Sequence, residues 1–401
     1  MSVVIVGTLD TKGEEIEFTR TILEEQGVDV HVIDVGVIGD PTFPPDTSAD
    51  AVAAEAGSSL QELRERSERG HAMEVMGAGA AQIASHLHED GKLDGILGLG
   101  GSGNTSVATR AMRALPYGIP KLMVSTVASG DVRPYVGARD IMMLYSVADI
   151  EGLNQLTKRI LSNAALSMVG MVSNDPDLDI VDRPTIAITM FGVTTTGVQY
   201  ARDYLEEKGY EVLVFHATGT GGQSMEALIR AGVIDGVLDM TTTELADHLV
   251  GGVLSAGPDR LTAAADSDIP QVVSTGALDM VNFGALDTVP EEFQDRTLLV
   301  HNPEVTLMRT TVTECAELGK RLAEKVNKST APCSVMLPLA GVSQIAVDGE
   351  EFYDPAADSA LFDSIRETIA DHVDLDEREM AINDEAFAVA AARTLDAYMS
   401  G

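Results

Sequence analysis

Short apolar runs alternate with amphipathic stretches from the beginning of the chain. Residues 3–6 are continuously apolar, which is typical of a strand buried on both faces of a sheet. Residues 14–26 carry apolar side chains at helical spacing and end before Gly27, and residues 28–35 predict the next strand. A strand, a helix and a strand in this order predict a parallel sheet with right-handed crossovers.

The same alternation continues through the first half of the chain. We expect further strands at 95–99, 121–125 and 141–147, and helices at 50–69, 73–88, 106–115 and 153–171. Residues 173–184 are rich in Asp and Pro and predict a linker. The chain of 401 residues is therefore expected to form two domains, at 1–182 and 183–401.

The second half begins with the pattern of the first. A strand at 185–190, a helix at 198–208 and a strand at 211–215 repeat the opening order. Three pairs of segments match in the same order: 23–27 with 205–209, 93–97 with 234–238, and 119–126 with 269–275. These matches predict an internal duplication of one α/β unit. A strand at 334–338 and helices at 359–372 and 384–398 are expected to close the second domain.

The chain is strongly acidic, with 63 Asp and Glu residues against 27 Lys and Arg residues and a net charge of −36. The acidic residues are spread along the sequence, which favours a surface adapted to molar internal salt, as in a salt-loving archaeon. An acidic cytosolic protein without that adaptation is the alternative. In either case nucleic acid and anionic membranes are disfavoured as partners, because binding to them requires a basic face.

Two further features favour a location in the cytoplasm. The chain passes directly into the strand at 3–6 without a signal peptide, and it has no apolar run long enough to span a bilayer. Its two cysteines, Cys315 and Cys333, form no CxxC pair and have no adjacent histidine cluster, so neither a disulfide framework nor a zinc site is expected.

A glycine-rich loop follows the predicted strand at 95–99. Its glycines let the backbone approach a ligand closely, and the helix after it offers free N–H groups and the positive end of its dipole. We therefore expect this loop to bind a phosphate, although a tight turn with packing glycines is the alternative. The loop is not a Walker A motif, but its glycine spacing fits the dinucleotide pattern. The expected contacts are Gly100, Gly101, Ser102, Gly103, Asn104 and Thr105.

The loop after the first strand, at 8–13, carries hydroxyl, acidic and basic side chains. We expect Lys12 to reach a phosphate and Asp10 to hold Mg²⁺. A capping box formed by Thr11 and Glu14 is a second interpretation, compatible with the first. The remaining predicted ligand contacts are Thr8 and Thr11 in this loop and Ser125 and Thr126 after a later strand.

The second half has its own glycine- and hydroxyl-rich loop, at 216–224. His216 stands at the end of a predicted strand, where a histidine can act as a general acid or base near neutral pH, or can be structural. The candidate catalytic residues are His216, Asp279, His301 and Arg309. The sequence contains no nucleophile elbow and no HExxH motif, so the reaction stays open.

Taken together, these motifs resemble a known family. The segments that carry the resemblance are 7–14, 98–103, 124–132, 216–222, 276–283, 301–303 and 352–355. They are similar to the family of the tomato mosaic virus resistance protein N-terminal ATP-binding domain, over nearly the whole chain. The resemblance implies two Rossmann-like three-layer domains with parallel sheets, a homodimer and ATP binding. The plant member also binds a viral replication protein, which we do not expect of a microbial chain.

Two positions depart from that family's pattern. Asn104 stands where a glycine is common, and Ala340 stands where a basic residue is common, which weakens any prediction of anion binding at 339–343. The family implies no catalytic residues.

Three functional hypotheses follow. The first is an ATP-binding enzyme acting on a small phosphorylated or carboxylated metabolite at the inter-domain cleft, which the candidate catalytic residues favour. The second is a non-catalytic nucleotide sensor, which the lack of a base–nucleophile pair favours. The third is a binder of an unphosphorylated sugar or acid whose glycine loops are only turns. Whether both halves hold a site is left open.

Overall fold

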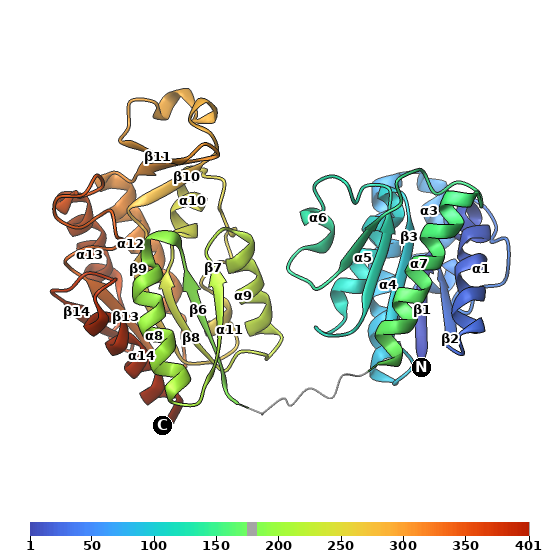
Figure 1. The fold of residues 1–401 in the computed structure, drawn as a ribbon, viewed down its shortest axis with the longest axis horizontal. Coiled ribbons are helices and arrows are strands. Elements are labelled where there is room, and N and C mark those ends of the chain that lie inside the picture. The colour runs from blue at the N-terminus through green and yellow to red at the C-terminus, as the bar shows by residue number, and fades with distance from the viewer. Residues whose placement is uncertain (175–182, 401) are drawn as a thin grey trace. The chain divides into compact units, whose positions relative to one another are not determined.

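The computed structural model describes residues 1–174 and 183–400 and divides into two compact units, Met1–Asp179 and Ile180–Gly401 (Figure 1). Each unit is built on a parallel β-sheet with helices on both faces. This arrangement confirms the predicted fold class of two Rossmann-like α/β domains. The predicted linker at 173–184 overlaps residues 175–182, which lie outside the described residues.

The N-terminal sheet has the strand order β2-β1-β3-β4-β5, and every pair of neighbours is parallel. Its strands are β1 (Ser2–Gly7), β2 (Asp29–Asp34), β3 (Gly95–Gly100), β4 (Lys121–Ser125) and β5 (Met142–Tyr145). Side chains alternate between the two faces of β1, so that Val4 and Val6 enter one core while Val3 and Ile5 enter the other.

Helices cover both faces of this sheet. Helices α1 (Leu9–Glu25) and α7 (Gln155–Ser173) share the core that contains Val3 and Ile5. The opposite core is closed by α2 (Ala49–Glu55), α3 (Leu60–Arg66), α4 (Arg69–Glu89) and α5 (Ser102–Ala114). A short helix, α6 (Arg133–Val136), precedes β5.

The C-terminal sheet has the order β14-β13-β9-β8-β6-β7 and is also entirely parallel. Its strands are β6 (Thr185–Met190), β7 (Glu211–His216), β8 (Gly236–Thr241), β9 (Gln271–Gly276), β13 (Cys333–Pro338) and β14 (Asp374–Arg378). Helices α8 (Thr195–Glu207) and α14 (Glu385–Ser400) share a core on one face. The other face of the sheet, formed by the alternate residues of its strands, packs against further helices. These are α9 (Thr220–Arg230), α10 (Glu244–Val250), α11 (Ala263–Asp266), α12 (Val312–Val326) and α13 (Pro355–Thr368).

The two sheets share one topology. Reading β7-β6-β8-β9-β13 against β2-β1-β3-β4-β5 pairs β6 with β1, β7 with β2, β8 with β3 and β9 with β4. An internal duplication predicts this correspondence. It also pairs the loops at the carboxyl ends of the strands, where open parallel sheets bind ligands.

The C-terminal unit carries an insertion that the sequence pattern did not predict. Between β9 and α12 the chain forms an antiparallel sheet of three strands in the order β10-β12-β11. These strands are β10 (Met280–Phe283), β11 (Leu298–Asn302) and β12 (Val305–Arg309). His301 and Arg309 therefore belong to this small sheet and not to the parallel one.

Several predicted elements of the first domain have different boundaries in the structure. The helix expected at 106–115 begins at Ser102, so the second half of the predicted glycine loop is its first turn, and the helix expected at 73–88 begins at Arg69. Helix α1 begins at Leu9, so most of the predicted loop at 8–13 is helical, with a local irregularity at Lys12. The helix predicted at 50–69 is two helices, because Gly57 has a positive φ of 75° and Ser59 caps a new start. The strand predicted at 141–147 is limited to β5, and Val147 has a positive φ of 65°.

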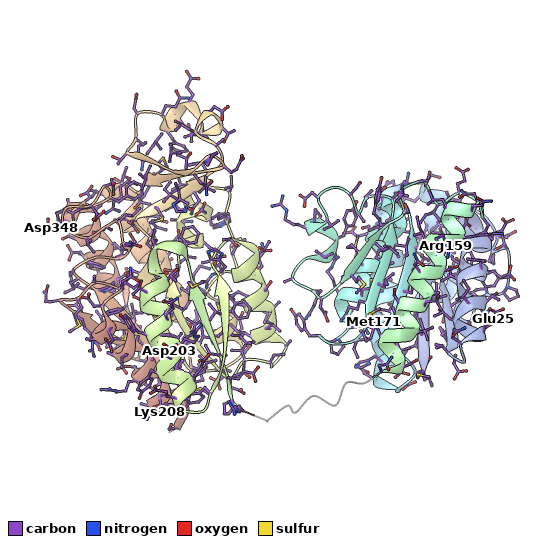
Figure 2. The ribbon with its side chains drawn as sticks, viewed as in Figure 1. Glu25, Arg159, Met171, Asp203, Lys208 and Asp348 are labelled. Carbon is purple, nitrogen blue, oxygen red and sulfur yellow. The ribbon has the colours of Figure 1, made fainter. Side chains whose placement is uncertain are left out.

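Both units carry acidic residues on their surfaces, while a few carboxylates, such as Asp239 and Glu244, are buried. Glu25, Asp203 and Asp348 are examples of carboxylates at the surface (Figure 2). Among the described residues, no helix combines the length and the apolar character that crossing a bilayer requires.

Candidate functional site

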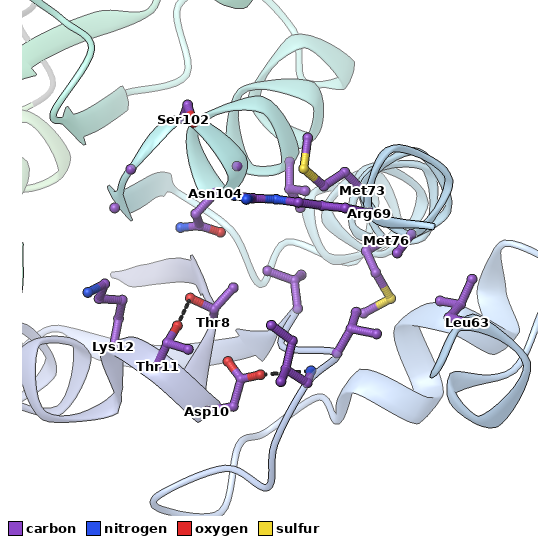
Figure 3. Close-up of a pocket in the computed structure, with 18 of the residues that line it drawn as sticks. Thr8, Asp10, Thr11, Lys12, Leu63, Arg69, Met73, Met76, Ser102 and Asn104 are labelled. Carbon is purple, nitrogen blue, oxygen red and sulfur yellow. Dashed lines mark hydrogen bonds between the residues drawn. The ribbon is translucent and has the colours of Figure 1, made fainter. Parts of the chain in front are cut away.

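A cavity of about 810 Å³ opens at the carboxyl edge of the N-terminal sheet (Figure 3). Its walls come from the chain that leaves β1 and β3, including the first turns of α1 and α5, from the loop after β2, and from helices α3 and α4. All of its lining residues belong to the N-terminal unit. The cavity lies where an open parallel sheet places its ligands, and its size is that of a small-molecule site.

One wall of the cavity is the start of helix α5. Its N-cap is Gly101, which has no side chain that could accept a hydrogen bond from the first turn. The N–H groups of that turn therefore have no side-chain cap, and the helix dipole adds a partial positive charge. Gly100 has a φ of +150°, a conformation that favours glycine, so the glycine at this position is a backbone requirement.

Three polar side chains around the cavity have no partner among the described residues. Lys12 is half-buried on one side, whereas Arg69 and Ser102 are exposed on the other (Figure 3). None of the three forms a hydrogen bond with the residues drawn there. Two unpaired cations are notable in a chain with a net charge of −36. The lining also includes the acidic residues Asp10, Glu68 and Asp149, so these two cations offer positive charge locally, where an anionic group could bind, and not over the whole cavity.

Asn104 lies at the base of this wall and is 7% exposed. Its Nδ2 atom donates hydrogen bonds to the carbonyl oxygens of Val6 (3.3 Å) and Leu99 (2.7 Å), which ties the ends of β1 and β3 together. Its Oδ1 atom is buried and has no partner within the described residues. A glycine at this position would lack this bridge between the two strands.

Asp10 holds the loop after β2. Its Oδ2 atom accepts hydrogen bonds from the backbone N–H groups of Ile38 and Gly39, both at 3.0 Å. Arg64 supports the same loop by donating to the carbonyl oxygens of Val37 (2.6 Å) and Gly39 (2.9 Å). The Oδ1 atom of Asp10 is buried without a partner, and no cluster of three or more His, Cys, Asp or Glu residues suited to a metal occurs in the described part of the chain. The magnesium role of Asp10 stays a prediction.

The cavity also has an apolar wall that the sequence analysis missed. Its members are Val35, Val37, Leu63, Ala72, Met73 and Met76. These residues fit the ordinary core pattern of strand ends and helices, so their spacing carried no separate signal. Arg69 was missed for a related reason, since an isolated arginine near a helix start is usually solvated.

The structure separates the predicted ligand contacts into two groups. Those that line the cavity are Thr8, Asp10, Thr11, Lys12, Gly100, Gly101, Ser102, Gly103 and Asn104. Thr105, Ser125 and Thr126 are not among the lining residues. Instead, the hydroxyl groups of Thr105 and Ser125 are hydrogen-bonded at 2.7 Å, and the N–H of Thr126 donates to the carbonyl of Gly100.

The capping box expected at the start of the first helix is absent. The helix begins earlier, at Leu9, and its N-cap Thr8 makes no side-chain capping bond. The hydroxyl groups of Thr8 and Thr11 are hydrogen-bonded to each other instead, at 2.9 Å. This correction leaves both hydroxyl groups at the edge of the cavity.

The glycine-rich loop of the second half is occupied by a side chain of the protein itself. Glu244, which is fully buried, accepts hydrogen bonds at Oε1 from the N–H groups of Gly219 (2.7 Å) and Gly222 (3.0 Å). Its Oε2 atom accepts from Nε of Arg260 at 2.6 Å. Burial raises the pKa of Glu244, while the guanidinium of Arg260 acts in the opposite direction.

The four candidate catalytic residues do not form one site. Asp279 and Arg309 are both buried: Ser343 donates to Asp279 Oδ2 at 2.8 Å, and Arg309 pairs with Asp358 at 2.6 Å. Burial raises the pKa of Asp279 to about 6, against the lowering effect of Arg309. His216 and His301 are exposed, and among the described residues neither side chain is hydrogen-bonded to the buried pair. His216 stacks near Phe191, with the ring centres 5.6 Å apart.

The chain matches two family models in succession. Residues 1–177 match the N-terminal domain of the Uncharacterised protein family (UPF0261), and residues 183–399 match the C-terminal domain of the same family. A UPF0261 protein of Clostridium tetani is 55% identical over 98% of both chains. The chain belongs to the UPF0261 family.

Other relatives of this UPF0261 chain come from different kingdoms. A UPF0261 protein of Rhizobium meliloti is 45% identical over 96% of both chains. The ToMV resistance protein Tm-1 of tomato is 42% identical over 89% of this chain, which spans half the length of the tomato protein. These relatives are bacterial and plant proteins, so an archaeal source is not supported.

Among solved structures, the UPF0261 chain is similar to the UDP-GlcNAc 2-epimerase of Methanocaldococcus jannaschii in complex with UDP-GlcNAc and UDP. The similarity covers 68% of this chain and 83% of the epimerase, at 11% identity and with a TM-score of 0.23. These values are too low to support a functional comparison.

Proposed function

We propose that the N-terminal cavity binds a nucleotide, with ATP as the favoured ligand. The observation that carries this proposal is the uncapped start of α5 in a cavity of about 810 Å³, with the unpaired cation Arg69 beside it and the unpaired cation Lys12 on the other side of the cavity. Backbone N–H groups at a helix start together with basic side chains are the donors that phosphate groups use in proteins.

The apolar wall supports a ligand that carries an apolar group in addition to its phosphate. Val35, Leu63, Met73 and Met76 offer methyl, methylene and thioether groups to the same cavity. A flat aromatic base gains favourable burial against such a wall, and Met side chains adapt to its edges. The combination of an anion-binding end and an apolar wall therefore fits a nucleotide better than it fits an unphosphorylated sugar or acid.

Magnesium is proposed as the counter-ion of the nucleotide phosphates. Mg²⁺ at such sites is commonly held by one or two carboxylates together with the phosphates. Asp10 is the candidate carboxylate, through its unpartnered Oδ1 atom, although its Oδ2 atom is already committed to the loop after β2.

The cavity favours a binding or sensing role over catalysis by its own residues. None of the described residues that line it is a histidine or a cysteine, and its acidic residues are Asp10, Glu68 and Asp149. We therefore propose a nucleotide sensor as the first interpretation. An enzyme that uses the nucleotide with a small phosphorylated or carboxylated metabolite is the second interpretation, and turnover of ATP on addition of metabolite pools would favour it.

Two further proposals concern the state of the protein. The family resemblance supports a homodimer, which sedimentation of the purified chain would test. The dispersed carboxylates support a surface adapted to high salt in the cytoplasm.

Calorimetric titration with ATP and Mg²⁺ in molar KCl tests the proposed function. Gly101→Val is the informative variant: Gly101 has an ordinary negative φ of −81°, and a Cβ there meets only the Thr126 hydroxyl at 3.7 Å, so folding is expected to survive. We expect wild type to bind and this variant to lose binding. Gly130→Val, in an exposed loop, is the matched control and should bind as wild type does. Wild type that binds no nucleotide would refute the proposal.

A further inference from the structure

The duplicated topology gives two residues corresponding places, each in the first turn of a helix. Strand β8 is the counterpart of β3, and each is followed by a helix that begins at the carboxyl edge of its sheet. Helix α5 begins at Ser102, and helix α10 begins at Glu244. Ser102 and Glu244 are therefore each the first residue of the helix that follows the corresponding strand, although the matched segments 93–97 and 234–238 align Glu244 with Gly103.

The two side chains behave differently. Ser102 is exposed beside the N-terminal cavity. Glu244 reaches instead to the start of α9, where its carboxylate accepts from two backbone N–H groups and from the guanidinium of Arg260. Main-chain N–H groups at a helix start and an arginine are the donors that a bound phosphate or carboxylate would otherwise use.

All of these donors already form hydrogen bonds with carboxylates of the protein itself. Arg260 is 1% exposed and also pairs with both carboxylate oxygens of Asp239. A Cβ atom on Gly222 would collide with the Glu244 carboxylate, so the loop closes tightly on this group. In the first half, by contrast, Arg69 is exposed and the cavity is open.

We infer that Glu244 is a built-in substitute for the anionic group of a ligand in the C-terminal domain, so that each chain binds one nucleotide, in the N-terminal cavity. The stoichiometry rests on the proposed nucleotide binding, whereas the role of Glu244 as an internal anion does not. The place that Glu244 fills is consequently a carboxylate site, which removal of the side chain would open to a small carboxylate from solution.

Calorimetry on the full-length chain with ATP and Mg²⁺ tests the stoichiometry. We expect about one ATP per chain for wild type and none for Gly101→Val. Two ATP molecules per wild-type chain, or one retained by Gly101→Val, would overturn the inference while leaving nucleotide binding in place. If wild type binds no ATP, the proposed function and the stoichiometry fail together, and the claim about Glu244 is decided by a separate measurement.

That measurement is chemical rescue of Glu244→Ala by formate. The variant leaves the N–H groups of Gly219 and Gly222 and the Nε of Arg260 without this acceptor. Replacing KCl by potassium formate at equal concentration should raise the Tm of Glu244→Ala by more than that of wild type. The matched control is Glu314→Ala, because Glu314 also accepts from a backbone N–H at a helix start and from an arginine but lies partly exposed, where water can replace it.

The outcomes of the rescue are decisive in both directions. A formate-specific gain for Glu244→Ala that Glu314→Ala lacks supports the internal-anion role, and equal effects in both variants overturn it. If Glu244→Ala does not fold in KCl, its recovery on refolding in formate supports the inference. Failure to recover in formate, with Glu244→Gln folded, counts against it.

Discussion

Arg69 lies over the first turn of helix α5, where its Nη2 atom is 3.2 Å from the point that a Cβ atom on Gly103 would occupy. The two residues come from different helices, since Arg69 begins α4 and Gly103 follows the first residue of α5. Their approach places an unpaired guanidinium beside N–H groups that lack a side-chain cap. The absence of a side chain at Gly103 is what allows this approach.

Gly103→Ala should therefore separate stability from binding. Alanine is the better helix former by about 0.5–1 kcal/mol, so the free energy of unfolding should stay the same or rise. The new methyl group lies within 3.2 Å of Arg69 Nη2 and shifts the guanidinium away from the start of α5, which should weaken ATP binding by at most about tenfold, the worth of part of one hydrogen bond to a charged group. Urea unfolding and calorimetry together measure the two effects.

Gly170→Ala is the control for this prediction. Gly170 lies in α7, and a Cβ there meets nothing within 4 Å. This variant should gain similar stability and bind ATP as wild type does. Unchanged binding by Gly103→Ala would show that ATP binding does not depend on the close approach of Arg69 to Gly103.

Arg260→Leu should strongly destabilise the C-terminal domain. The substitution leaves the buried carboxylates of Asp239 and Glu244 without their common cation. Removing one partner of a buried ion pair costs about 3–5 kcal/mol. Arg202→Leu breaks only exposed pairs with Asp203 and Glu206, so it should cost about 0–1 kcal/mol. Urea unfolding followed by circular dichroism compares the two, and equal losses would contradict the structural role of Arg260.

The stability of the C-terminal domain should fall as pH rises from about 4 to about 7. Burial raises the pKa of Asp247 from 3.8 to about 7, against the lowering effect of hydrogen bonds from Asn282 and Leu254. The folded state then holds a proton on Asp247 that the unfolded chain has released. This one group therefore lowers the free energy of unfolding by at most about 1.4 kcal/mol for each pH unit in this window. Asp279, with its pKa raised to about 6, acts in the same direction.

Asp247→Asn should reduce this pH dependence at little cost in stability. Asn282 donates from Nδ2 to Asp247 Oδ2 at 2.7 Å, while its own Oδ1 atom has no partner among the described residues. A flip of the Asn282 amide would let it accept a hydrogen bond from the amide that the substitution introduces. Thermal unfolding between pH 4 and 8 is the measurement, and an unaltered slope in the variant would show that Asp247 is not the group responsible.

Stability should also rise with KCl concentration. The net charge of −36 gives self-repulsion that salt screens, as the Debye length falls from about 10 Å at 0.1 M to about 3 Å at 1 M. Thermal unfolding in a KCl series should show a rising Tm, whereas sucrose at matched osmolality controls for effects of excluded solute. A Tm that is independent of KCl would refute adaptation of this surface to salt.

Much of the fold could be predicted because it depends on local pattern. The apolar run at 3–6 is β1, and the matched segments 23–27 and 205–209 end corresponding helices. The antiparallel sheet was missed because its short strands, such as β11 with its exposed His301, lack a strong alternation. The early start of α1 was missed because Thr8 to Gly13 has the composition of a turn, and packing of Leu9 into the core overrides it.

The candidate site was predictable only on its loop side. Glycines and a lysine directly after parallel strands predict a ligand site, and these residues do line the cavity. The opposite wall, with Arg69 and Met76, comes from helices whose local pattern is that of an ordinary amphipathic helix. Its contribution depends on how α4 packs against α5, which local spacing does not encode.

The sequence by itself determined the alternating α/β elements, the duplication and the acidic surface, because each of these follows from composition or from short-range periodicity. Only the tertiary structure decided which glycine loop is open. The loops at 100–104 and 216–222 have the same chemistry in sequence, yet one borders a cavity and the other is filled by Glu244. The reason is that a buried carboxylate reaches its donors across 22 to 25 residues of chain, a distance that only the folded packing of β8, α9 and α10 can close.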